Sequence, residues 1–266
     1  MSKQRHKEIE GVGITYERFA IYQVLKKLAI EYGIHKVLEI PASGAKAMPG
    51  LYSLGFALAG CDVYLINAKE EAKKVWHKLG FTTHVYFVEA ENIEHTELMD
   101  GAFDMVWNCI VFPTYKNPDK LLDEMIRLSS KYILTVSVNG YNLGFPWHRF
   151  LHFITRIPWT HGNVSFYFIN KMVKFFKMHH LKIIETGIVD APPWPDSIGF
   201  RDIRLHRIKI PLEDVDWYPT IIDYVKDNNY PMWIKILWKI EMLKLPTWIN
   251  LLRAHLFYVL AEKLCQ

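Results

Sequence analysis

The feature that most constrains the fold is a regular alternation of two patterns between residues 36 and 140. Short apolar runs, which are typical of buried strands, occupy residues 36–40, 61–68, 83–90, 102–112 and 131–140. Helical spacing of apolar residues lies between them at 51–59, 69–80 and 117–130. This alternation predicts βαβ units, and hence a doubly wound α/β sheet with helices on both faces.

The flanking segments follow other patterns. Residues 15–32 show helical spacing, and we expect a helix there that ends at Gly33. After residue 140 aromatic residues become frequent, and from about residue 214 the pattern is helical. The chain is therefore expected to comprise an N-terminal tail and helix (1–33), a Rossmann-like domain (34–190) with an aromatic-rich insertion (141–168), and a mostly helical C-terminal extension (191–266).

Composition excludes several classes of protein. A net charge of +4 over 266 residues is far below that of a dedicated nucleic-acid binder. The three cysteines are too few and too widely spaced for a disulfide framework, which favours a reducing compartment. The N-terminus has no apolar segment of a secretory signal, and no stretch of about 18 residues lacks charge. We expect a cytoplasmic protein without a transmembrane helix.

In a doubly wound sheet, ligands bind at the carboxyl ends of the strands. Glu39 ends the first predicted strand, and a loop of small residues follows it. Small residues let the backbone approach a ligand closely, so this loop suits a nucleoside. Asn67 ends the second strand, where a polar side chain can hold ribose hydroxyls, although it could instead cap the next helix. Glu89 or Glu91, after the third strand, could reach an adenine or could be a solvated acid.

Three segments in this order carry a family resemblance. They are VLEIPASGA from residue 37, FVEAENI from residue 87, and DGAFDMVWN from residue 100 with the helix and strand that follow it. Over about residues 34–140 the chain resembles the class I S-adenosylmethionine-dependent methyltransferases, in particular the UbiE-like group that acts on small molecules. The usual loop is rich in glycine, whereas this chain has Pro41, Ser43 and Ala45 at the glycine positions.

The resemblance implies S-adenosylmethionine as cofactor and a role for each matching position. Glu39 would face the methionyl ammonium, Asn67 beside Ala68 would hold the ribose hydroxyls, and Glu89 with Ala90 would meet the adenine. The remaining implied contacts lie beside the methionine and ribose, at Pro41, Ser43 and Gly44, and beside the reactive methyl group, at Asn108 and Ile110.

Candidate residues on the acceptor side are histidines and rings. His148, His152 and His161 are candidate bases, needed only if the acceptor must lose a proton. His148 and His152 would share one face of a helix, a spacing that also suits a metal pair. No third ligand is evident from the sequence, so we predict no metal. Tyr16 and Tyr22 could cover the cofactor or could pack within the helix.

Aromatic residues between 141 and 168, among them Trp147 and Trp159, lie where the family builds its acceptor cover. They favour a hydrophobic or aromatic acceptor, although a second core layer would use the same residues. Residues 232–264 combine three tryptophans with lysines and Arg253. This segment could pack on the domain, form a homodimer, or lie at a membrane surface.

The sequence therefore predicts a methyltransferase acting on a small, hydrophobic or aromatic acceptor. A protein of the same fold that has lost catalysis and serves as a binding or scaffold subunit is the alternative, because the loop is poor in glycine. A nicotinamide oxidoreductase is disfavoured because no GxGxxG follows the first strand. Nucleic-acid modification is disfavoured because the chain has no basic stripe and continues after the fourth strand as Asn-Cys-Ile-Val from residue 108.

Overall fold

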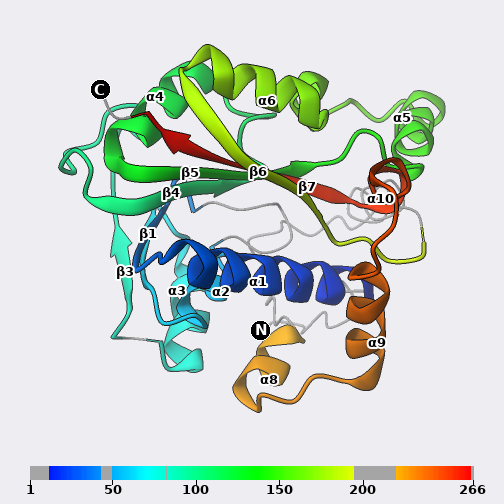
Figure 1. The fold of residues 1–266 in the computed structure, drawn as a ribbon, viewed down its shortest axis with the longest axis horizontal. Coiled ribbons are helices and arrows are strands. Elements are labelled where there is room, and N and C mark those ends of the chain that lie inside the picture. The colour runs from blue at the N-terminus through cyan, green and yellow to red at the C-terminus, as the bar shows by residue number, and fades with distance from the viewer. Residues whose placement is uncertain (1–11, 43–49, 82, 195–219, 265–266) are drawn as a thin grey trace, which may run out of the picture.

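The structure is a computed structural model, and it describes residues 12–42, 50–81, 83–194 and 220–264 (Figure 1). Its centre is a seven-stranded mixed sheet in the order β3-β2-β1-β4-β5-β7-β6. The strands are β1 (Lys36–Glu39), β2 (Asp62–Ile66), β3 (Val85–Val88), β4 (Phe103–Cys109), β5 (Ser129–Val138), β6 (Leu181–Val189) and β7 (Leu256–Lys263). The first five run parallel to one another, which confirms the predicted doubly wound α/β fold.

Helices cover both faces of the sheet, as the sequence pattern predicts. The helices are α1 (Val12–Tyr32), α2 (Leu54–Ala57), α3 (Glu70–Leu79), α4 (Pro118–Leu128), α5 (Gly144–Thr155), α6 (Ile169–Met178), α8 (Ile221–Lys226), α9 (Met232–Glu241) and α10 (Thr247–Arg253), with a 3-10 turn η2 (Val164–Tyr167). One core cluster joins the sheet to α1, α2, α3, α8 and α9. A second joins the opposite face to α4 and α6 (Figure 1).

Strand alternation assigns the side chains of β1 and β4 to these two cores. Val37 and Trp107 belong to the core beneath α1, whereas Leu38 and Val106 belong to the core beneath α4. Successive side chains of a strand point to opposite faces, so Glu39 lies on the α1 face. The tight crossing of α1 and α2 depends on Gly55, where an added Cβ would approach the carbonyl oxygen of Tyr22 to 2.7 Å.

The C-terminal segment differs from the prediction of a mostly helical extension. Residues 256–263 form β7, which runs antiparallel to β5 on one side and to β6 on the other. The helical prediction was wrong there because a short apolar run fits a buried helix and a buried strand equally well. The end of the chain is thus an interior part of the sheet.

The helices before β7 are placed differently from one another. In α9, Trp233 and Trp238 pack against the first core, and the ring of Trp238 meets that of Phe19 edge to face at 5.8 Å. In α10, Trp248 is 64% exposed. Of the alternatives for residues 232–264, packing on the domain therefore applies to α9, whereas α10 exposes the apolar ring of Trp248. Within the described ranges, no helix combines the length and the apolarity needed to cross a bilayer.

Candidate active site

Glu39 is the last residue of β1 and is fully buried. Its Oε2 accepts a hydrogen bond of 2.6 Å from the hydroxyl of Ser53, which precedes α2. The same hydroxyl oxygen accepts a hydrogen bond of 2.9 Å from the indole Nε1 of Trp107 on β4. Ser53 thus links the Glu39 carboxylate on β1 to Trp107 on β4.

The other oxygen of Glu39 gives the site its chemical character. Oε1 is buried and has no hydrogen-bond partner among the described residues. Burial raises the pKa of Glu39 to about 7, although the Ser53 hydrogen bonds oppose that rise. Because an unpaired buried carboxylate is costly, a cationic ligand at Oε1 would be strongly favoured. The methionyl ammonium of S-adenosylmethionine supplies such a cation, so this residue fits the cofactor that the sequence resemblance implies.

The loop after β1 is fixed at both of its described ends. The amide of Ala42 donates to the carbonyl of Ile66 at 2.7 Å, and the indole of Trp76 donates to the carbonyl of Gly50 at 2.6 Å. Pro41 is partly buried at the start of the loop. The implied contacts at Ser43 and Gly44 lie outside the described residues.

Asn67 and Ala90 were both expected beside the adenosyl group, and the structure brings them together. Asn67 Oδ1 accepts from the Ala90 amide at 2.9 Å, and Asn67 Nδ2 donates to the Ala90 carbonyl at 2.9 Å. The side chain therefore clamps the loop after β2 to the loop after β3. The helix-capping alternative does not hold, because the N-cap of α3 is Lys69. An amide has two donors and two lone pairs, so Asn67 retains capacity for a ribose hydroxyl.

The clamp predicts a graded loss of stability at Asn67. Asn67 has a positive φ of 55°, which glycine tolerates and alanine does not. We expect Asn67→Gly to lower the free energy of unfolding by about 1–2 kcal/mol through the two lost hydrogen bonds. Asn67→Ala should cost roughly 1 kcal/mol more from backbone strain. Urea denaturation of both variants measures the difference, and unchanged stability of Asn67→Gly would show that the clamp contributes nothing.

The remaining implied cofactor contacts are placed less favourably. Glu89 is exposed and forms a surface ion pair with Lys73 at 2.9 Å, as expected of a solvated acid. Asn108 is buried beneath α4, where its Oδ1 accepts from the hydroxyl of Thr135 at 2.7 Å. The Asn108 side chain thus points to the opposite face from Glu39. Ala68 is buried after β2, and Ile110 lies just after β4 with a φ of 57°.

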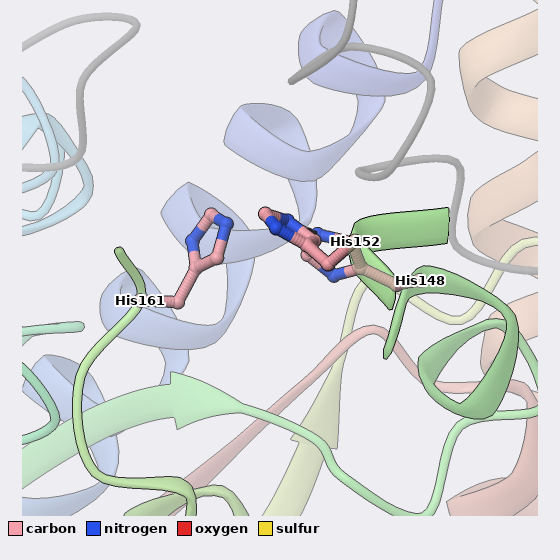
Figure 2. Close-up of side chains that lie close together, drawn as sticks. All are labelled: His148, His152 and His161. Atoms are coloured by element: carbon pink, nitrogen blue, oxygen red, sulfur yellow. Dashed lines mark hydrogen bonds between the residues drawn. The ribbon is translucent and has the colours of Figure 1, made fainter. Parts of the chain in front are cut away.

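The three candidate bases form one cluster at the same edge of the sheet. His148 and His152 lie on the inner face of α5, and their Nε2 atoms are 3.1 Å apart. His161, in the loop after α5, faces them (Figure 2). One ligating nitrogen from each ring lies within 4.8 Å of the other two. The shared helical face was predicted, whereas the approach of His161 was not.

The candidate substrate residues divide into two groups. Tyr16 and Tyr22 are buried in the α1 core, and the Tyr16 hydroxyl donates to the Glu241 carboxylate at 2.7 Å. The structure supports the packing alternative for both, rather than a cover over the cofactor. Trp147 is 45% exposed on α5. The ring of Trp159 lies against all three histidine rings, with centroid distances of 5.3, 5.1 and 4.8 Å to His148, His152 and His161.

Sequence reasoning missed Ser53 and Trp107. Both touch the Glu39 network, yet neither lies in a motif that marks such a role. The available signal was strand parity, because Trp107 is directly opposite Glu39 in the β1–β4 pairing. No local signal identifies Ser53, which reaches Glu39 only through the packing of α2.

Comparisons with known proteins agree with this architecture. Residues 47–131 match a family described as a methyltransferase domain. A candidate methyltransferase from Bacillus halodurans C-125 superposes with a TM-score of 0.53 at 16% identity, covering 91% of this chain and 98% of that chain. Magnesium protoporphyrin IX methyltransferase from Synechocystis PCC 6803, with bound SAH, gives a TM-score of 0.50 at 16% identity over 66% and 78% of the two chains.

The fold does not by itself specify the reaction. The [4+2]-cyclase SpnF also superposes, with a TM-score of 0.53 at 12% identity, covering 91% of this chain and 80% of that chain. One fold can host several chemistries, so function must be argued from the site.

The sheet, its two helical layers and the acidic strand end define a Rossmann-like methyltransferase fold. Within this fold, residues 47–131 match the methyltransferase-domain family. S-adenosylmethionine is the cofactor of this class of domain.

Proposed function

We propose that this protein transfers a methyl group from S-adenosylmethionine to a small, hydrophobic or aromatic acceptor, as members of the UbiE-like group do. The observation that carries the proposal is the buried carboxylate of Glu39, held by Ser53 and with Oε1 left for a ligand cation. When bound, the cofactor supplies a sulfonium methyl group that is already activated for displacement. The protein then has to bind the cofactor and the acceptor, orient them for the transfer, and exclude water from the site.

Named residues can perform these tasks. Glu39 would pair with the methionyl ammonium and fix that end of the cofactor. Asn67, held in place by its bonds to Ala90, would offer its spare amide hydrogen and lone pair to the ribose hydroxyls. The buried residues Ala42 and Ala68 border the loop ends and would keep water from the cofactor.

The acceptor class is proposed from the apolar surface that follows β5. Trp147, Phe150 and Phe153 on α5 are 45%, 47% and 82% exposed. Exposed aromatic residues in such a concentration are unusual for a surface without a partner. Because α5 directly follows a strand whose carboxyl end lies at the site, these rings could receive an apolar acceptor. The same surface supports contact with a membrane as the source of that acceptor.

Calorimetric titration with S-adenosylmethionine tests the proposal. We expect binding in the micromolar range, followed by transfer of an isotopically labelled methyl group into material that an organic solvent extracts. If millimolar S-adenosylmethionine produces no binding heat, the alternative of a catalytically inactive scaffold subunit is favoured. If S-adenosylmethionine does bind, mass spectrometry of small molecules that copurify with the protein identifies the acceptor class.

A further inference from the structure

The histidine cluster has features that a group of packed side chains does not need. His148 and His152 are buried, and together with His161 they present one ligating nitrogen each within a space 4.8 Å across (Figure 2). The three residues come from two separate segments of the chain. The helix supplies two of them one turn apart, and the loop after it brings the third back to face them.

The loop that carries His161 is held on both sides. The hydroxyl of Tyr167 donates to the carbonyl of His161 at 2.8 Å, and the amide of Asn163 donates to the carbonyl of Pro113 at 2.6 Å. Between them Gly162 has a φ of 76°, and a Cβ there would lie 1.9 Å from the Pro113 carbonyl oxygen. This glycine is therefore required for the close approach. The loop is anchored to the segment after β4, which places His161 at the carboxyl edge of the sheet.

The hydrogen bonds of His152 orient its ring for ligation. His152 Nδ1 lies 3.0 Å from the carbonyl oxygen of Ile157, which can only accept, so Nδ1 carries a hydrogen. In the neutral ring Nε2 then carries the lone pair, and this atom lies 3.1 Å from His148 Nε2. A backbone carbonyl that fixes the tautomer in this way is the usual outer partner of a metal-binding histidine.

From this geometry we propose that His148, His152 and His161 bind one divalent transition-metal ion of the zinc class. Tetrahedral zinc with bonds of about 2.0–2.1 Å places its ligand nitrogens about 3.3 Å apart. The His148–His152 separation is already close to that value, and the His161 nitrogen lies within 4.8 Å of the other two. Three imidazoles are typical ligands of zinc, copper, nickel and iron rather than of magnesium or calcium.

The number of ligands indicates the kind of site. Structural zinc sites have four protein ligands, whereas three protein ligands leave a position for water or for a substrate atom. The described residues contain no further histidine, cysteine or acidic side chain in this group. The ion would thus keep an open position beside the ring of Trp159, at the edge where the acceptor is expected. The metal site itself does not depend on methyl transfer, because its ligands are separate from the Glu39 network.

Titration with cobalt(II) chloride tests the site, since tetrahedral cobalt gives intense visible absorption. We expect the wild-type protein to bind one ion per chain. Loss of an outer-shell partner alone costs about 10- to 100-fold in affinity, so His161→Gln should cost at least about 100-fold. His95→Gln, which changes an exposed histidine outside the cluster, is the matched control and should bind as the wild type does.

Quenching of tryptophan fluorescence provides a second measurement. Trp159 contacts all three rings, so cobalt should quench part of the emission of the nine tryptophans, and Trp159→Phe should remove most of that quenching without changing the stoichiometry. Circular dichroism confirms that each variant is folded. Equal cobalt affinity in wild type and folded His161→Gln would overturn the proposal, leaving a hydrogen-bonded histidine cluster.

Discussion

A chain truncated after Ala254 is expected not to fold. The truncation removes β7, whose residues from Leu256 to Ala261 are each at most 5% exposed. β7 is hydrogen-bonded to β5 and to β6, so its loss exposes the edge of β5 and detaches β6 from the sheet. We expect insoluble protein, or soluble protein without a cooperative urea transition. The reason is that β7 forms the hydrogen-bond ladders with β5 and with β6 and contributes side chains to the core on each face of the sheet.

A shorter truncation is the matched control. Removing residues 264–266 leaves β7 complete, and Leu264 is 52% exposed. This variant should unfold with the wild-type midpoint. A soluble, cooperatively unfolding chain truncated after Ala254 would show instead that the C-terminal region is a peripheral attachment, such as a membrane anchor.

Glu39→Gln is expected to weaken the binding of S-adenosylmethionine at least tenfold while raising the stability of the ligand-free protein. The affinity falls because the amide cannot form an ion pair with the methionyl ammonium. Calorimetry of the variant and the wild type at pH 8 measures this effect. Unchanged affinity would remove Glu39 from the cofactor site.

The stability effect depends on pH in a defined direction. The folded-state pKa of Glu39 is about 7, above the usual value of 4.5, so the folded protein holds this proton more tightly than the unfolded chain does. Stability from this group is therefore lost as pH rises between about 4.5 and 7. The full difference is about 3 kcal/mol above pH 7. Relative to wild type, Glu39→Gln should gain up to that amount between pH 4.5 and pH 8, measured by urea denaturation.

Ser53→Ala provides a control for the electrostatic argument. The hydrogen bond from the Ser53 hydroxyl lowers the pKa of Glu39, so its removal should raise that pKa further, while the backbone hydrogen bond of Ser53 remains. Because the carboxylate is the form that binds the ammonium, the pH midpoint of cofactor binding should move upward in Ser53→Ala. The pH dependence that Glu39 gives to cofactor binding should be absent in Glu39→Gln. An unchanged midpoint in Ser53→Ala would show that the hydrogen bond from the Ser53 hydroxyl does not affect the pKa of Glu39.

The parallel part of the sheet could be predicted closely from the sequence. Each strand from β1 to β5 lies within a short apolar run of the sequence, so local periodicity is sufficient. The end of α3 could also be predicted from the sequence, because a glycine such as Gly80 readily adopts the left-handed conformation found at this helix end. Glu39 was identifiable for a related reason: an acidic residue at the end of a buried strand needs a partner.

Other features depended on residues that are distant in the chain. Residues 256–263 have the composition of a helix or of a strand, and only the free edges of β5 and β6 decide between them. Asn67 was expected at the site, but its engagement with Ala90 depends on the relative position of two loops. The burial of Tyr16 similarly depends on Glu241, which lies 225 residues away.

The sequence by itself determined the class of fold and predicted the edge of the sheet that carries the candidate site, with the Glu39 carboxylate at its centre. Each follows from periodicity or from the cost of burying charge within a few residues. Tertiary structure decided that β7 completes the sheet, that Ser53 and Trp107 hold Glu39, and that His161 joins the histidine pair on α5. These arrangements depend on contacts between distant segments, and such contacts are fixed only when the whole chain packs.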